Sequence, residues 1–98
     1  MYYKNFYKEL SEKEIEKSIR IDGFDPIRFS NRSGDVYRLH KHPETKLLAF
    51  LKGGMCVTVA GKHVTCRAGD KLIIPGNTPH SAKVDDDGCK FFWSEKIL

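Results

Sequence analysis

The sequence has few cysteines, and none are spaced as a redox or zinc motif. Of its 98 residues only three are cysteine: Cys56, Cys66 and Cys89. An odd count without a Cys-x-x-Cys pair argues against both a disulfide framework and a cysteine zinc site. We therefore expect reduced, buried thiols. Because the first residues do not read as a secretory signal, we also expect a cytoplasmic location.

Long hydrophobic runs are also missing. The longest apolar stretch, Leu47 to Leu51, is far too short to cross a bilayer, so we expect no membrane partner. The chain contains no internal repeat, no low-complexity segment and no composition change typical of a linker. A chain of this length then predicts one domain with a single, small core.

Charge of one sign is not concentrated anywhere in the chain. The formal net charge is +4, but the 17 basic residues are interspersed with 13 acidic ones along the whole length. No basic run or arm could follow a phosphate backbone. We therefore expect no nucleic-acid partner, in spite of the basic pI of about 9.0.

A helix is predicted near the N-terminus, over residues 12–21. Ser11 and Glu14 have the spacing of a capping box, Ile15 and Ile19 fall on one helical face, and Gly23 is a suitable stop. We expect this helix to cover one face of the domain without contributing to a site. The aromatic residues 1–7 before it allow two interpretations, a frayed end or a strand laid against a partner subunit.

From residue 25 onward the sequence alternates short apolar stretches with turn residues. About eight short strands are expected, with turns that include residues 52–54 and 85–88. This pattern is typical of an all-β sandwich or barrel. We therefore divide the chain into an N-terminal aromatic segment and helix, residues 1–24, and a single β domain, residues 25–98.

Three histidines are the main candidates for chemistry. His40 and His42 are two residues apart, so in an extended chain both imidazoles leave the same face. His80 follows a proline-containing turn that could return the chain beside them. Three neutral imidazoles suit Zn, Ni, Fe(II) or Cu and disfavour Mg and Ca. His63 has the opposite parity to its apolar neighbour Val64, and we expect it to face solvent.

These histidines lie in two segments that resemble the motifs of the cupins. The first motif of that family is matched in spacing by Gly34, His40, His42, Lys46 and Gly53. The second is matched by Gly69, Pro75, Asn77, His80 and Val84. The resemblance implies a double-stranded β-helix, or jelly-roll (cupin) barrel, with a metal at the three histidines. It also implies a homodimer, since small cupins usually gain stability by dimerising.

One departure from the family pattern affects the chemistry. Lys46 stands where the family has a carboxylate ligand, and a protonated ammonium cannot ligate a metal. Three outcomes are open: Lys46 could bend to the rim of a three-histidine site, or Glu44 could supply the carboxylate as a fourth ligand. Alternatively Lys46 could form an anion-binding pocket with Arg38, which has the same strand parity as His40.

The expected site is a cavity for a small-molecule ligand. Its predicted apolar wall consists of Leu48, Phe50, Val57, Leu72 and Ile74. One functional hypothesis is a metal-dependent oxygenase or isomerase, which requires a metal and an open cavity. The alternative is a non-catalytic module for a small anion or sugar, without a tightly bound metal. A purely structural protein would instead have a filled interior, and the fold alone selects none of these.

Overall fold

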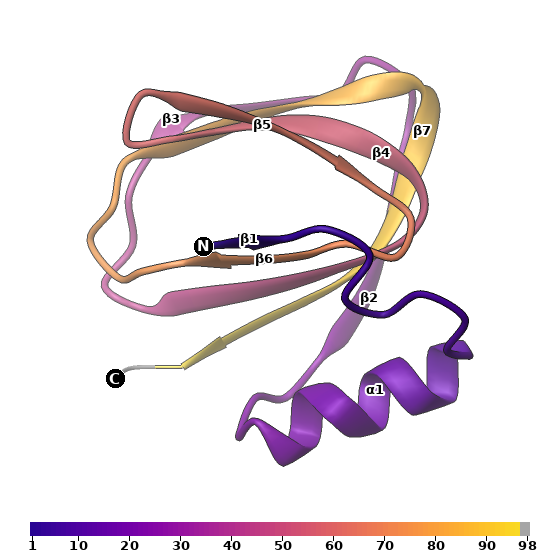
Figure 1. Cartoon of the computed structure of the whole chain (residues 1–98). Coiled ribbons are helices and arrows are strands. Elements are labelled where there is room, and N and C mark those ends of the chain that lie inside the picture. Colours follow the sequence, from indigo (N-terminus) through magenta and orange to yellow (C-terminus); the bar gives the residue numbers. More distant parts are fainter. Residues whose placement is uncertain (97–98) are drawn as a thin grey trace.

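The structure, a computed structural model that describes residues 1–96, is an antiparallel β barrel with one helix on its outside (Figure 1). The expected all-β cupin-type barrel is thereby confirmed, although the expected segment 25–98 extends two residues beyond the described range. The elements are β1 (Tyr2–Tyr3), α1 (Glu12–Ile21), β2 (Ile27–Asn31), β3 (Val36–His40), β4 (Thr45–Val59), β5 (Lys62–Arg67), β6 (Lys71–Ile74) and β7 (His80–Lys96).

Two long strands, β4 and β7, form the frame of the barrel. They pair with each other along most of their length and also pair β6, β5, β2 and β3 on their other edges. Both strands curve around the barrel in Figure 1. The prediction that the chain reverses at residues 52–54 and 85–88 is wrong. The backbone continues there as a bent strand with shifts in register. Such bulges let a strand bend without ending.

Side chains alternate between the two faces of β4, as its sequence requires. Leu48, Phe50 and Val57 point into the barrel and are buried in one apolar cluster. Leu47 and Ala49 point outward into a second cluster beneath the helix. The first cluster surrounds the interior cavity, whereas the second fixes the helix to the outside.

The helix has the predicted bounds and the predicted start. The Ser11 side chain accepts from the Glu14 backbone N–H, and the Glu14 carboxylate accepts from the Ser11 backbone N–H. Ile15 and Ile19 are buried against the outward residues of β4. No residue of α1 lines the histidine site described below. Within residues 1–96, no helix is long and apolar enough to cross a membrane.

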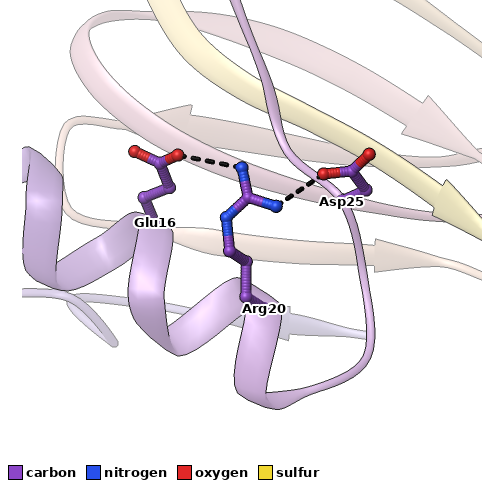
Figure 2. Close-up of polar contacts among 3 residues, drawn as sticks. All are labelled: Glu16, Arg20 and Asp25. Carbon is purple, nitrogen blue, oxygen red and sulfur yellow. Dashed lines mark hydrogen bonds and ion pairs between the residues drawn. The ribbon is translucent and has the colours of Figure 1, made fainter.

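Arg20 connects the end of the helix to the segment that enters β2. Its guanidinium donates to Glu16 at 3.0 Å and to Asp25 at 2.6 Å, as Figure 2 shows. Both pairs are solvent-exposed, so they contribute little to stability. Their effect is to guide the chain from the helix to the barrel rather than to stabilise the core.

The N-terminal aromatic segment begins as a short strand of the barrel of its own chain. Tyr2 and Tyr3 pair with β6 of the same chain. The Tyr2 hydroxyl donates to the buried Asp70 carboxylate at 2.6 Å, and the Asn5 backbone N–H donates to the same carboxylate at 2.9 Å. The segment therefore extends the barrel by one short strand.

The three cysteines form no disulfide. Cys66 and Cys89 are buried, and burial raises the pKa of each thiol to about 12. At neutral pH both are protonated and unreactive. This agrees with the expectation of reduced core thiols.

Gly53 provides a test of the bend in β4. Its φ is +69°, and an added Cβ would collide with the carbonyl oxygen of Gly88 on β7. Gly53→Ala should therefore lower the free energy of unfolding by about 2 kcal/mol or more, measured by chemical denaturation. Gly34→Ala is the matched control, because Gly34 also has a positive φ but open space around it. This variant should lower the free energy of unfolding by about 1 kcal/mol. Equal losses of unfolding free energy in the two variants would mean that the close approach of Gly53 to Gly88 does not restrict residue 53.

Candidate metal centre

The structure brings His40, His42 and His80 together at one end of the barrel interior. One ring nitrogen from each lies within 4.8 Å of those of the other two. His40, the last residue of β3, is the register partner of His80, the first residue of β7. The loop after β3 then returns His42 to the same space, with its ring centroid 4.6 Å from that of His40 and 5.5 Å from that of His80.

A bulge in β3 determines which side chains accompany the histidines. Tyr37 pairs with Ala82 and His40 pairs with His80, so β3 has one residue more than β7 between these points. The extra residue lets Tyr37 and His40 both face the cavity and leaves Arg38 exposed. The expected shared parity of Arg38 with His40 does not hold, because it assumed an unbroken strand.

Hydrogen bonds orient two of the three imidazoles. His80 Nδ1 lies 2.8 Å from the carbonyl oxygen of Thr78, and His40 Nδ1 contacts the carbonyl oxygen of Arg38. A carbonyl only accepts, so each Nδ1 carries the proton and each Nε2 keeps its lone pair. A hydrogen bond from the second ring nitrogen to a backbone carbonyl is usual for metal-bound histidines.

The environment of two of the imidazoles, those of His42 and His80, favours the neutral form. Burial lowers the pKa of His80, and a hydrogen bond to Thr78 only partly opposes this. The pKa of His42 is lowered too, first by burial and then by the positive charge of Lys46. Both rings are therefore unprotonated at pH 7, which is the form that ligates metals.

Lys46 points into the barrel, as its strand parity predicted. Its side chain is nearly fully buried, with Nζ 3.1 Å from Glu95 Oε2 and 4.3 Å from the centre of the Trp93 ring. It does not bend to the rim. Glu95 was not found from the sequence, because its position opposite Lys46 follows from the pairing of β4 with β7.

Two other candidates lie outside the cluster. Glu44 is half-buried, but its carboxylate is not part of the group of potential ligands that the three histidines form. His63 lies on the exposed side of β5, with Nδ1 2.8 Å from the hydroxyl of Thr58. His63 therefore has the outward orientation that was expected.

The three histidines open onto a cavity of about 80 Å³ with largely apolar walls. Leu48, Val57 and Ile74 line it as expected, whereas Phe50 and Leu72 lie deeper in the core. The remaining lining residues, which the sequence did not single out as wall, are Tyr37, Met55, Ala82, Phe91 and Trp93. These five residues could be identified as cavity wall only once the strand register and the bulge in β3 were known.

Outside this cavity lies a wider groove of about 250 Å³, which we call the aromatic groove. It is lined by Phe29, Tyr37, Phe91 and Trp93 together with His40 and His42. The cavity and the groove share most of these residues, so they are adjacent hollows beside the histidines. A concave apolar site with a few convergent polar groups is typical of small-molecule binding.

A curved antiparallel barrel with histidines converging in its interior defines the class of protein. The family described as a cupin domain matches residues 28–95, and the chain belongs to this family. No curated protein matches the chain in sequence.

Solved structures share the fold at low sequence identity. KdgF from Halomonas sp. is 17% identical, with a TM-score of 0.70 over 76% of this chain and 69% of that chain. An RmlC-like cupin from Shewanella frigidimarina is 19% identical, with a TM-score of 0.69 over 76% and 67%. A Bacillus subtilis oxalate decarboxylase with Mn(II) centres is 22% identical, with a TM-score of 0.65, and the match covers 74% of this chain but only 20% of that one.

The donor set fits a divalent transition metal. Three neutral imidazoles with converging ring nitrogens are the ligands that Zn, Ni, Fe(II) or Cu accept. Lys46 contributes no ligand, and its charge is balanced by Glu95. The cavity beside the histidines leaves room for a water molecule or a ligand to complete the coordination.

The charge at Lys46 can be tested by measuring metal affinity. Lys46→Glu removes a cation that opposes a metal and adds a carboxylate beside the histidines, so the Kd for Zn²⁺ should fall by about tenfold or more. Lys52→Glu is the matched control, because Lys52 is an exposed residue of the same strand. The Kd of this variant for Zn²⁺ should be nearly that of the wild type. The same Kd in both variants would show that Lys46 does not act on the site.

Proposed function

We propose that this cupin binds one divalent transition metal through His40, His42 and His80, and that it acts on a small molecule as a metal-dependent oxygenase or isomerase. The observation that supports this most strongly is the meeting of three ring nitrogens within 4.8 Å at the end of an apolar cavity. The Mn(II) centres of the oxalate decarboxylase support metal binding on this fold. That enzyme's own activity is not proposed, because its match covers a fifth of its chain.

The groups around the histidines would support such chemistry in different ways. A bound metal would supply Lewis acidity to a ligand oxygen. The carbonyl groups of Thr78 and Arg38 hold the His80 and His40 rings in the required tautomer. The apolar walls limit water near the site, which strengthens every electrostatic interaction inside it.

The second candidate function is a non-catalytic module that binds a small anion without tightly held metal. The buried ammonium of Lys46 at the cavity favours this alternative. Arg38 no longer supports it, because this side chain is exposed. Sugar binding is also less well supported, because most of the lining residues are apolar and offer few partners for hydroxyl groups. The structural-protein hypothesis required a filled interior, and the cavity argues against it.

Homodimer formation also remains a proposal. Within residues 1–96, β2 lies at the end of the sheet order and pairs along one edge only, with β7. Ile27 on β2 and Val36 and Leu39 on β3 are more than half exposed, and unpaired apolar edge strands tend to associate. Sedimentation equilibrium should give twice the chain mass, and Ile27→Lys should shift it toward the monomer. A wild-type monomer at all concentrations would contradict the proposal.

Metal content is the direct test of the proposed function. Protein purified without metal columns or chelators should contain about one equivalent of Zn, Ni, Fe or Cu per chain by elemental analysis, as a single three-histidine site requires. His42→Ala should lose this metal and keep the β circular-dichroism spectrum. His63→Ala should keep it, because His63 is bonded to Thr58 away from the cluster. Full metal content in His42→Ala would refute the site, and so would a failure of wild-type protein to bind added metal.

A further inference from the structure

We propose that the ligand of this site is a small carboxylate with an apolar body, whose anionic oxygen accepts a hydrogen bond from Lys46. Glu95 is the residue that positions the Lys46 ammonium for this contact. The inference rests on the proposed metal site and adds to it the chemical class of the ligand. It follows from the donors of Lys46, from the walls of the cavity and from the aromatic groove.

The ammonium of Lys46 has more hydrogen-bonding capacity than its surroundings use. A lysine ammonium carries three N–H donors. Among the described residues, the Glu95 carboxylate forms an ion pair with it at 3.1 Å, and the centre of the Trp93 ring lies 4.3 Å from Nζ. The residue is only 3% exposed, which leaves little solvent contact for the remaining donors. Buried charged donors are normally satisfied, and the cavity that Lys46 lines is the place where an acceptor can enter.

The ion pair is not needed to fill the barrel. A buried ion pair is weak evidence of stabilisation, because apolar residues of similar volume often serve equally well. Leu48 and Ile74 nearby show that this part of the barrel accommodates apolar side chains. Glu95 lies opposite Lys46 on the neighbouring strand and forms an ion pair with its ammonium. The ammonium is thereby held at the cavity that the three histidines also line.

The walls specify the rest of the ligand. Apart from Lys46, Tyr37 and the histidines, the cavity is lined by aliphatic residues, Phe91 and Trp93. At about 80 Å³ it accommodates a carboxylate with a short carbon chain, and the aromatic groove outside it accommodates a longer body. Phe29 stacks on Phe91 with ring centroids 5.9 Å apart, yet it is 42% exposed. This exposed ring offers an apolar surface to an alkyl or aryl group.

The experiment compares carboxylates with the amides of the same shape. Acetate, butyrate and benzoate, and then acetamide, butyramide and benzamide, are titrated calorimetrically into Zn²⁺-loaded wild type, Lys46→Met and Lys52→Met. We expect at least one carboxylate to bind wild type at least about tenfold more tightly than its amide, the difference that one charge-assisted hydrogen bond gives. Lys46→Met should lose this preference, and Lys52→Met should retain it.

The outcomes separate this inference from the proposed metal function. If the protein takes up Zn²⁺ but no carboxylate binds, or carboxylates bind Lys46→Met as tightly as wild type, the ligand class is wrong and the metal site stands. If the protein takes up no Zn²⁺, the titrations are made on the metal-free chain. A preference for carboxylates that disappears in Lys46→Met then supports the inference while the metal function fails, and its absence overturns both.

Discussion

The pairing of β7 with its neighbours is the constraint on which the site depends. One end of β7 lies beside β3, so His80 is opposite His40. The other end lies beside the start of β4, so Glu95 is opposite Lys46. The two ends meet across the barrel because both long strands bend at glycine-containing bulges. A shift of one residue would turn these side chains to the outside, and the centre would be lost.

The ion pair between Lys46 and Glu95 gives this barrel an unusual charge distribution. A single carboxylate in place of Lys46 would neutralise part of a metal's charge by direct ligation. Here the carboxylate lies one strand away and neutralises the ammonium instead. A metal on three neutral imidazoles would then keep its full positive charge, and this charge attracts an anionic ligand. The apolar cavity reinforces the attraction, because it excludes the water that would screen it.

The sequence predicted those features that depend on local chemistry. The capping box and the spacing of Ile15 and Ile19 determined the helix, and motif spacing identified the three histidines. What could not be predicted depends on register. One extra residue in β3 exposes Arg38 and places Tyr37 at the edge of the cavity, and no local signal marks it. The partnership of Lys46 with Glu95 joins residues that are far apart in the chain, so it is visible only once β4 and β7 are paired.

The most direct test of the account is nuclear magnetic resonance of the histidine ring nitrogens during titration with Zn²⁺. We predict that the Nε2 signals of His40 and His80, together with one ring nitrogen of His42, shift and saturate at one equivalent. Nδ1 of His40 and His80 should remain protonated, and His63 should not respond. Absence of any shift, or a response of His63 equal to that of the other three, would contradict the three-histidine centre.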